Sequence, residues 1–144
     1  MNELGFLTTH VGNEKHGAPA RGSSDSDVLE FAQRSRQIIV TSNHDMILIC
    51  AEAGQQFVWL DPRGRQYDRT EQVLLVFSQI RQREKLLAAT TDGCVRSMRT
   101  KCYGITPSEA ARLAEARMRA LRRRKRSHTA PALGPLLTTE RDVP

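Results

Sequence analysis

Residues 37–46 most constrain how this chain of 144 residues can fold. Residues 37–41 are mainly apolar and β-branched, which predicts a short buried strand. A polar turn from Thr41 to Asn43 follows at once, and a helical pattern then begins with Asp45 in its first turn. Strand, polar turn and helix start form the unit on which α/β proteins place ligand sites at the carboxyl edge of a sheet. We therefore expect functional side chains in this turn.

Strand and helix signals alternate along the first hundred residues. Strands are expected at residues 5–11, 37–41, 56–60 and 94–100. Helices are expected at residues 25–35, 45–54 and 70–87, the last as one helix of about five turns. This alternation predicts an α/β fold with right-handed crossovers, a mostly parallel sheet and helices on both faces.

The first residues suggest that the chain begins inside a larger unit. Met1 to Leu4 has the character of a last helical turn, with Gly5 just past its end. A helix remnant with nothing before it is unusual at a true N-terminus. We therefore expect the domain over residues 1–104 to be incomplete at its N-terminal end.

The excess positive charge lies in the C-terminal part. Residues 101–144 contain ten Arg and Lys and four Asp and Glu, which accounts for the whole net charge of +6. A capping box at Thr106 to Glu109 predicts a basic helix over residues 105–127. Residues 128–144, with their prolines and small polar residues, are expected to be a disordered tail. A neutral body with a basic appendage indicates an anionic partner, with nucleic acid the first choice.

Several protein classes are disfavoured. No run reaches the roughly 18 apolar residues that span a bilayer, and the first residues lack signal-peptide character. We therefore expect a cytoplasmic protein without a membrane partner. Cys50, Cys94 and Cys102 show no CxxC spacing, so they are expected to be buried reduced thiols rather than zinc ligands.

Asp25 and Asp45, with Asn43 beside the second, form the first candidate site. Asp25 begins a predicted helix and Asp45 follows the central strand, so both could lie at the same edge of the sheet. Phosphodiester hydrolysis uses hard divalent cations, which take oxygen ligands of this kind. The alternative is that these residues only cap and start their helices.

Three segments resemble the compact PIN-like nuclease family, small proteins of VapC-type toxin character. They are Gly5-Phe6-Leu7-Thr8-Thr9-His10-Val11, Ser24-Asp25-Ser26-Asp27-Val28-Leu29-Glu30-Phe31-Ala32 and Ile38-Ile39-Val40-Thr41-Ser42-Asn43-His44-Asp45-Met46. The resemblance covers about residues 1–100 and agrees in the order and spacing of the segments. It implies a PIN-like three-layer α/β/α sandwich and, in active members, ribonuclease activity that depends on Mg²⁺ or Mn²⁺.

The family's site residues transfer only in part. The resemblance makes Asp25 and Asp45 catalytic and metal-binding, with Asn43 a weaker ligand and Thr41 matching the family's threonine. Asn43 stands where the family has an acid, and Met46 stands where it has phenylalanine. The family's N-terminal strand and its acid are missing as well. Loss of two negative charges should lower cation affinity sharply.

Four other residues are weaker candidates. Asp61 ends the expected strand 56–60 and could be a further ligand, although the Asp61-Pro62-Arg63-Gly64 sequence is more typical of a turn. His10 and His16 read as ordinary loop or edge residues. His44 is expected to point to solvent, with a role as base or phosphate contact as the alternative.

Basic residues form the second candidate site, for nucleic acid. Residues 117–126 contain seven Arg and Lys, with Arg112 nearby. Arg and Lys bind phosphate without reading sequence, and no aromatic residues are interleaved for base stacking. The alternative is a solvated helix end. The predicted contacts are Arg96, Arg99, Arg119, Arg122, Arg123, Arg124, Lys125 and Arg126.

The leading hypothesis is a toxin-like PIN endoribonuclease whose metal site is compromised. The runner-up is a non-catalytic PIN-like remnant that binds nucleic acid or an antitoxin partner. A helical antitoxin-like protein is a third alternative, and the strand content argues against it. Small α/β toxins often dimerise, so a homodimer is a further expectation.

Overall fold

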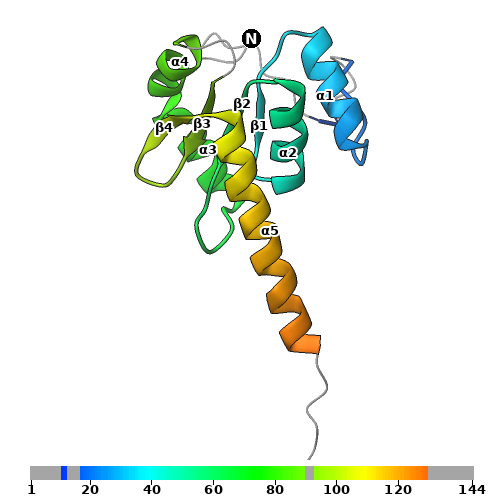
Figure 1. Ribbon diagram of the computed structural model, residues 1–144. Helices are drawn as coiled ribbons and strands as arrows, with labels where there is room; N and C mark the ends of the chain where they lie inside the picture. Colours follow the sequence, from blue (N-terminus) through cyan, green and yellow to red (C-terminus); the bar gives the residue numbers. More distant parts are fainter. Residues whose placement is uncertain (1–10, 13–16, 90–92, 130–144) are drawn as a thin grey trace, which may run out of the picture.

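The computed structural model describes residues 11–12, 17–89 and 93–129, and it contains five helices and four strands within them (Figure 1). The elements in chain order are α1 (Asp25–Arg34), β1 (Ile39–Thr41), α2 (His44–Ala53), β2 (Phe57–Leu60), α3 (Arg69–Ser78), α4 (Ile80–Ala88), β3 (Cys94–Ser97), β4 (Cys102–Ile105) and α5 (Pro107–Thr129). Helices and strands alternate from α1 to α3, as expected, whereas α3 and α4 follow each other directly, as do β3 and β4.

The four strands form one open sheet in the order β1-β2-β3-β4. Strands β1, β2 and β3 are parallel, with Thr41 opposite Trp59 and Trp59 opposite Arg96. Strand β4 is antiparallel to β3, and its last residue Ile105 lies opposite Cys94. The predictions of an α/β class and a mostly parallel sheet are confirmed.

Alternate residues of β2 face opposite layers of helices, because successive side chains of a strand point to opposite faces. Phe57 and Trp59 belong to one core with residues of α1, α2 and α5. Val58 and Leu60 belong to a second core with residues of α3 and α4. All four side chains are buried, which explains why this strand is a continuous apolar run.

Local sequence signals fix the starts and ends of the helices. Ser24 caps α1 and forms a capping box with Asp27. Asp68 does the same for α3, with Glu71 as its partner. Gly54 ends α2 in the left-handed conformation with φ 67°, which a residue with a side chain adopts reluctantly.

Helix α5 belongs partly to the core and partly to solvent. It begins after β4, at the amino edge of the parallel strands, and packs along α2 through the fully buried residues Ala110 and Ala114. It reaches the carboxyl edge at Arg117 and continues to Thr129, well beyond the rest of the molecule (Figure 1). It thus runs two residues into the segment expected to be a disordered tail, whose remainder lies outside the described residues.

The expectation of one helix over residues 70–87 is wrong. The chain leaves helical geometry at Gln79, with φ −112° and ψ 10°, and α4 starts at the next residue. The Gln79 side chain donates a hydrogen bond of 2.9 Å to the carbonyl oxygen of Met98 in the β3–β4 turn. This long-range contact stabilises the break between α3 and α4. No proline or glycine within residues 69–88 indicates the break in the sequence.

The expectation of one last strand over residues 94–100 is also wrong. Strand β3 ends at Ser97, and the backbone N–H of Met98 donates to the carbonyl oxygen of Lys101 at 2.8 Å. The chain then returns as β4, which the sequence analysis missed. Residues 98–101 lack the Gly, Pro, Asn or Asp that usually mark a turn.

Other expectations have mixed outcomes. Cys50, Cys94 and Cys102 are buried and take part in no disulfide bond, in agreement with the prediction of buried reduced thiols. Within the described part of the chain, every helix is too short or too polar to cross a bilayer. The predictions for residues 1–10, including the first strand, the missing acid and His10, lie outside the described residues, as does the prediction for His16.

The packing of α5 on α2 leads to a stability prediction. Ala114→Leu places three extra carbon atoms at a fully buried position of the α2–α5 contact, so the free energy of unfolding should fall by about 1–3 kcal/mol in urea titrations. Ala116→Leu is the matched control, because Ala116 is exposed on the same helix. Equal stability of the two variants would contradict the described packing.

Candidate functional site

The carboxyl ends of β1, β2 and β3 bring several polar side chains to one edge of the sheet. Because the three strands are parallel, the residues that follow them share this edge. Asn43 and Asp45 follow β1, Asp61 follows β2, and Arg99 follows β3. Helix α5 adds Arg117 from its middle, so the ends of three strands and one helix contribute to this edge.

Asn43 caps α2 in the turn that follows β1. Its backbone N–H donates to Thr41 Oγ1, and its Oδ1 accepts from the backbone N–H of Asp45, both at 3.0 Å. Asp45 is exposed in the first turn of α2, and Asp25 is partly exposed in the first turn of α1. Asn43 therefore caps its helix, as the alternative to a metal site expects.

The predicted metal ligands do not amount to a metal centre by themselves. Among the described residues, no three His, Cys, Asp or Glu side chains gather closely enough to hold a metal ion. The Asn43 oxygen is already used as a helix cap. The described donor set thus does not fit a Mg²⁺ or Mn²⁺ site, which needs several converging oxygen ligands.

Asp61 lies at the centre of a buried ionic cluster. Its side chain is fully buried. Oδ2 accepts a hydrogen bond from Arg96 Nε at 2.6 Å and forms an ion pair with Arg96 Nη2, also at 2.6 Å. Oδ1 accepts from Arg117 Nη1 and from the backbone N–H of Arg63. Burial by itself would raise the pKa of Asp61, but the hydrogen bonds from Arg117 and Arg96 outweigh it and lower the pKa. The carboxylate is therefore ionised and saturated with donors.

Trp59 packs against both arginines of this cluster. The guanidinium carbons of Arg96 and Arg117 lie 5.2 and 5.1 Å from the indole centroid, within the range of cation–π attraction. Arg96 Nη1 also donates to Tyr103 Oη at 2.6 Å. We call the five residues Asp61, Arg96, Arg117, Trp59 and Tyr103 the Asp61 cluster.

His44 lies beside the Asp61 cluster rather than in open solvent. Its ring meets that of Trp59 edge-on, with the centroids 5.9 Å apart, and the side chain is only partly exposed. Burial, followed by the positive charge of Arg117, lowers the pKa of His44 below 6.5. His44 was expected to point to solvent; instead its ring packs against Trp59 and is only partly exposed.

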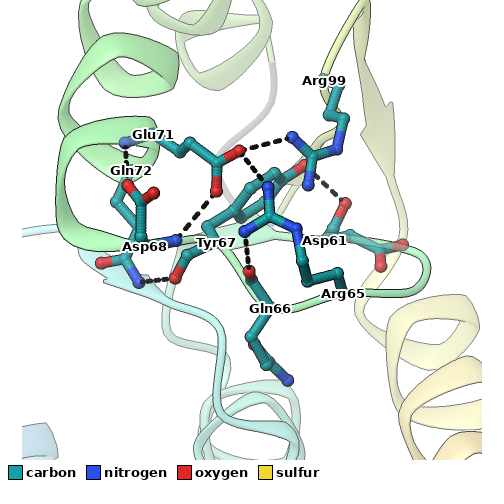
Figure 2. Close-up of polar contacts among 8 residues, drawn as sticks. All are labelled: Asp61, Arg65, Gln66, Tyr67, Asp68, Glu71, Gln72 and Arg99. Carbon is teal, nitrogen blue, oxygen red and sulfur yellow. Dashed lines mark hydrogen bonds and ion pairs between the residues drawn. The ribbon is translucent and has the colours of Figure 1, made fainter.

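A second ionic cluster lies next to the first, at the start of α3 (Figure 2). Glu71 Oε1 pairs with Arg65 at 2.6 Å and with Arg99 at 3.0 Å. The backbone N–H of Asp68, then Arg99 and Arg65, lowers the pKa of Glu71 to about 2. We call Glu71, Arg65 and Arg99 the Glu71 cluster.

Tyr67 connects the two clusters. Its hydroxyl donates to the carbonyl oxygen of Asp61 at 3.0 Å, and the guanidinium carbon of Arg99 lies 4.8 Å from its ring centroid. Figure 2 shows the Tyr67 hydroxyl pointing to Asp61, with the Arg99 side chain beside the ring. Each cluster has two guanidinium groups and one carboxylate.

The distal half of α5 supplies the remaining predicted basic residues. Those at positions 119 and 122–126 are all exposed, and we call residues 119–126 the basic arm. Arg119 lies 4.0 Å from Glu115, a distance at which an exposed ion pair contributes little. Arg112, nearer the start of α5, is exposed too.

The structure divides the predicted nucleic-acid residues into two groups. Arg96 is nearly buried and bound to Asp61, whereas Arg99 is half exposed in the β3–β4 turn. Sequence reasoning treated Asp61 as a turn residue or metal ligand and counted Arg117 only as part of the basic segment 117–126. It assigned no site role to Trp59 or Tyr103. One signal was available: an arginine inside the apolar strand 94–97 needs a buried acid as its partner.

Comparisons with protein-family models, with curated proteins and with solved structures found no match to this chain.

The Asp61 cluster leads to a second stability prediction. Asp61→Asn leaves two adjacent guanidinium groups without a counter-charge, so unfolding should become easier by about 3–5 kcal/mol in urea titrations. Asp45→Asn, at an exposed helix start, should cost less than about 1 kcal/mol. If Asp61→Asn is as stable as Asp45→Asn, the Asp61 carboxylate does not stabilise the fold by balancing the charges of Arg96 and Arg117.

Proposed function

We propose that this chain is an RNA-binding protein of PIN-like α/β/α architecture that holds the RNA backbone with the basic arm of α5. The observation that carries the proposal is the position of this arm. Its cationic side chains are exposed and extend beyond the carboxyl edge, where the body exposes further arginines. The choice of RNA rests on the resemblance to the PIN-like family.

The dimensions and chemistry of the arm suit a phosphate backbone. The 12 residues that follow Arg117, up to Thr129, extend α5 by about 18 Å, enough to run along several nucleotides. The arm contains no Phe, Trp or Tyr on which bases could stack. Contacts of this type give affinity that depends on salt and carry little sequence information.

An acidic protein, such as an antitoxin, is the competing partner for the same arm. Release of condensed counterions distinguishes the two, because only a polyanion such as RNA condenses them along its length. RNA binding should therefore weaken steeply and log-linearly with salt.

The RNA-binding proposal predicts the effect of a double substitution. Arg122→Gln with Arg126→Gln removes two cations from adjacent turns of the arm. The slope of log affinity against log salt for single-stranded RNA should become shallower by about 1.4, because each phosphate contact contributes about 0.7. Fluorescence anisotropy at several salt concentrations measures this slope.

The matched control is Arg34→Gln with Arg81→Gln. It removes the same charge from exposed positions on α1 and α4, away from the arm. If both double variants lose the same affinity, net charge alone drives binding and the basic arm is not the RNA contact.

A second candidate function is divalent-metal-dependent RNA cleavage at Asp25 and Asp45. One observation favours it: both acids occupy first turns of helices that pack against each other. The described residues do not complete a metal site, so this activity stands as an alternative to binding alone.

The alternative has a direct test. If the protein cleaves RNA in the presence of Mn²⁺, Asp45→Ala and Asp25→Ala should each reduce the rate by about a hundredfold or more. Glu84→Ala, an exposed acid on α4, should cleave normally. Cleavage that persists in Asp45→Ala would rule out this site, and no cleavage by the parent protein would leave RNA binding as the function.

A further inference from the structure

The Asp61 cluster contains more positive than negative charge. Asp61 supplies one negative charge, whereas Arg96 and Arg117 supply two positive charges. Trp59 packs against both guanidinium groups but has no net charge to balance them. A partly buried surplus charge is costly unless an anion compensates it.

The two arginines differ in how many of their donors are used. All three nitrogens of Arg96 are engaged, two by Asp61 and one by Tyr103, and its side chain is only 10% exposed. Arg117 uses Nη1 for Asp61, and no hydrogen bond from its Nε or Nη2 to another described residue is found. Its side chain is 28% exposed. Arg117 therefore has both free donors and access to solvent.

Arg117 is also held in place before any ligand arrives. Asp61 fixes one end of its guanidinium, and the face of Trp59 supports the group at 5.1 Å. A fixed planar guanidinium loses little side-chain entropy on binding and matches the spacing of two phosphate oxygens. The indole N–H of Trp59, buried in the same cluster, has no hydrogen-bond acceptor among the described residues.

We propose that Arg117 binds a phosphate oxyanion at the carboxyl edge, with Asp61, Arg96 and Trp59 as its rigid support. The inference rests on the proposed function in taking this phosphate to belong to RNA. A free phosphate or a nucleotide has the same chemistry and would bind the same group. The Asp45 carboxylate, close enough to influence His44 electrostatically, opposes the anion and keeps the affinity for a single phosphate modest.

The tryptophan gives a direct signal for this site. Trp59 is the single tryptophan of the chain and contacts both guanidinium groups. Titration of the unmodified protein with inorganic phosphate, or with a 5′-nucleotide, should change its emission saturably. A chloride titration at equal ionic strength should not. In a separate experiment, fluorescence anisotropy measures the affinity of the protein for short single-stranded RNAs.

Variants assign the signal to one residue. Arg117→Gln should abolish the phosphate-dependent emission change and lower RNA affinity about tenfold, the effect of losing one charge-assisted hydrogen bond. It leaves the balanced Asp61–Arg96 pair, so the fold should persist. Arg117→Lys should be intermediate. Arg119→Gln, two residues along α5, should keep the emission change.

The outcomes separate this inference from RNA binding. If phosphate causes no saturable change and Arg117→Gln binds RNA as Arg119→Gln does, the phosphate site is wrong, although the basic arm can still bind RNA. If phosphate binds but RNA does not, the site stands and the RNA proposal fails. If Arg117→Gln does not fold, the phosphate titrations of the parent and of Arg117→Lys still decide.

Discussion

The buried carboxylate of Asp61 is the interaction on which the arrangement of the carboxyl edge depends. It lies at the end of β2, and its partners come from β3 and α5, with Tyr103 of β4 attached through Arg96. An unpaired carboxylate at this position would be costly to bury, so the three elements must meet around it. The same contact fixes where α5 crosses the sheet edge and therefore where the basic arm leaves the body.

A buried ionic cluster is weak evidence for stability alone. Well-packed apolar residues of similar size often stabilise a protein as well as a buried ion pair or better. The Asp61 cluster also has two arginines for one carboxylate, and the adjacent Glu71 cluster repeats that ratio. Both clusters place guanidinium groups at the edge where α/β proteins place ligands, and those of the Asp61 cluster are the more buried. The proposed anion-binding role would account for the surplus charge of the Asp61 cluster.

The two basic regions have different physical characters. The basic arm is exposed and extended, so its contacts with a polyanion are long-range and sensitive to salt. Arg117 is partly buried and oriented by Asp61 and Trp59, so its contact is local and depends on geometry. An RNA backbone bound along the basic arm would pass Arg117 where this residue reaches the carboxyl edge. The arm would attract the RNA by its charge, and Arg117 would bind one of its phosphates.

The sequence by itself determined the features that depend on local chemistry. Alternating apolar strands and helices gave the α/β class, Ser24 and Asn43 cap their helices as helix-start residues do, and Gly54 ends α2. The charge distribution along the chain placed the basic arm at the C-terminal end. These features need only neighbours within a few residues, so one sequence is enough to predict them.

Only the tertiary structure decided the features that depend on distant partners. The break at Gln79 is held by Met98, and the turn that creates β4 carries no local turn residue. Asp61 resembled a turn residue, and its backbone contact with Arg63 agrees. Its ionic partner Arg117, however, is 56 residues away. The sequence supplied the charged groups, but their roles depend on which of them the fold buries. A charged group is buried only with a partner, and that partner can come from a distant segment of the chain.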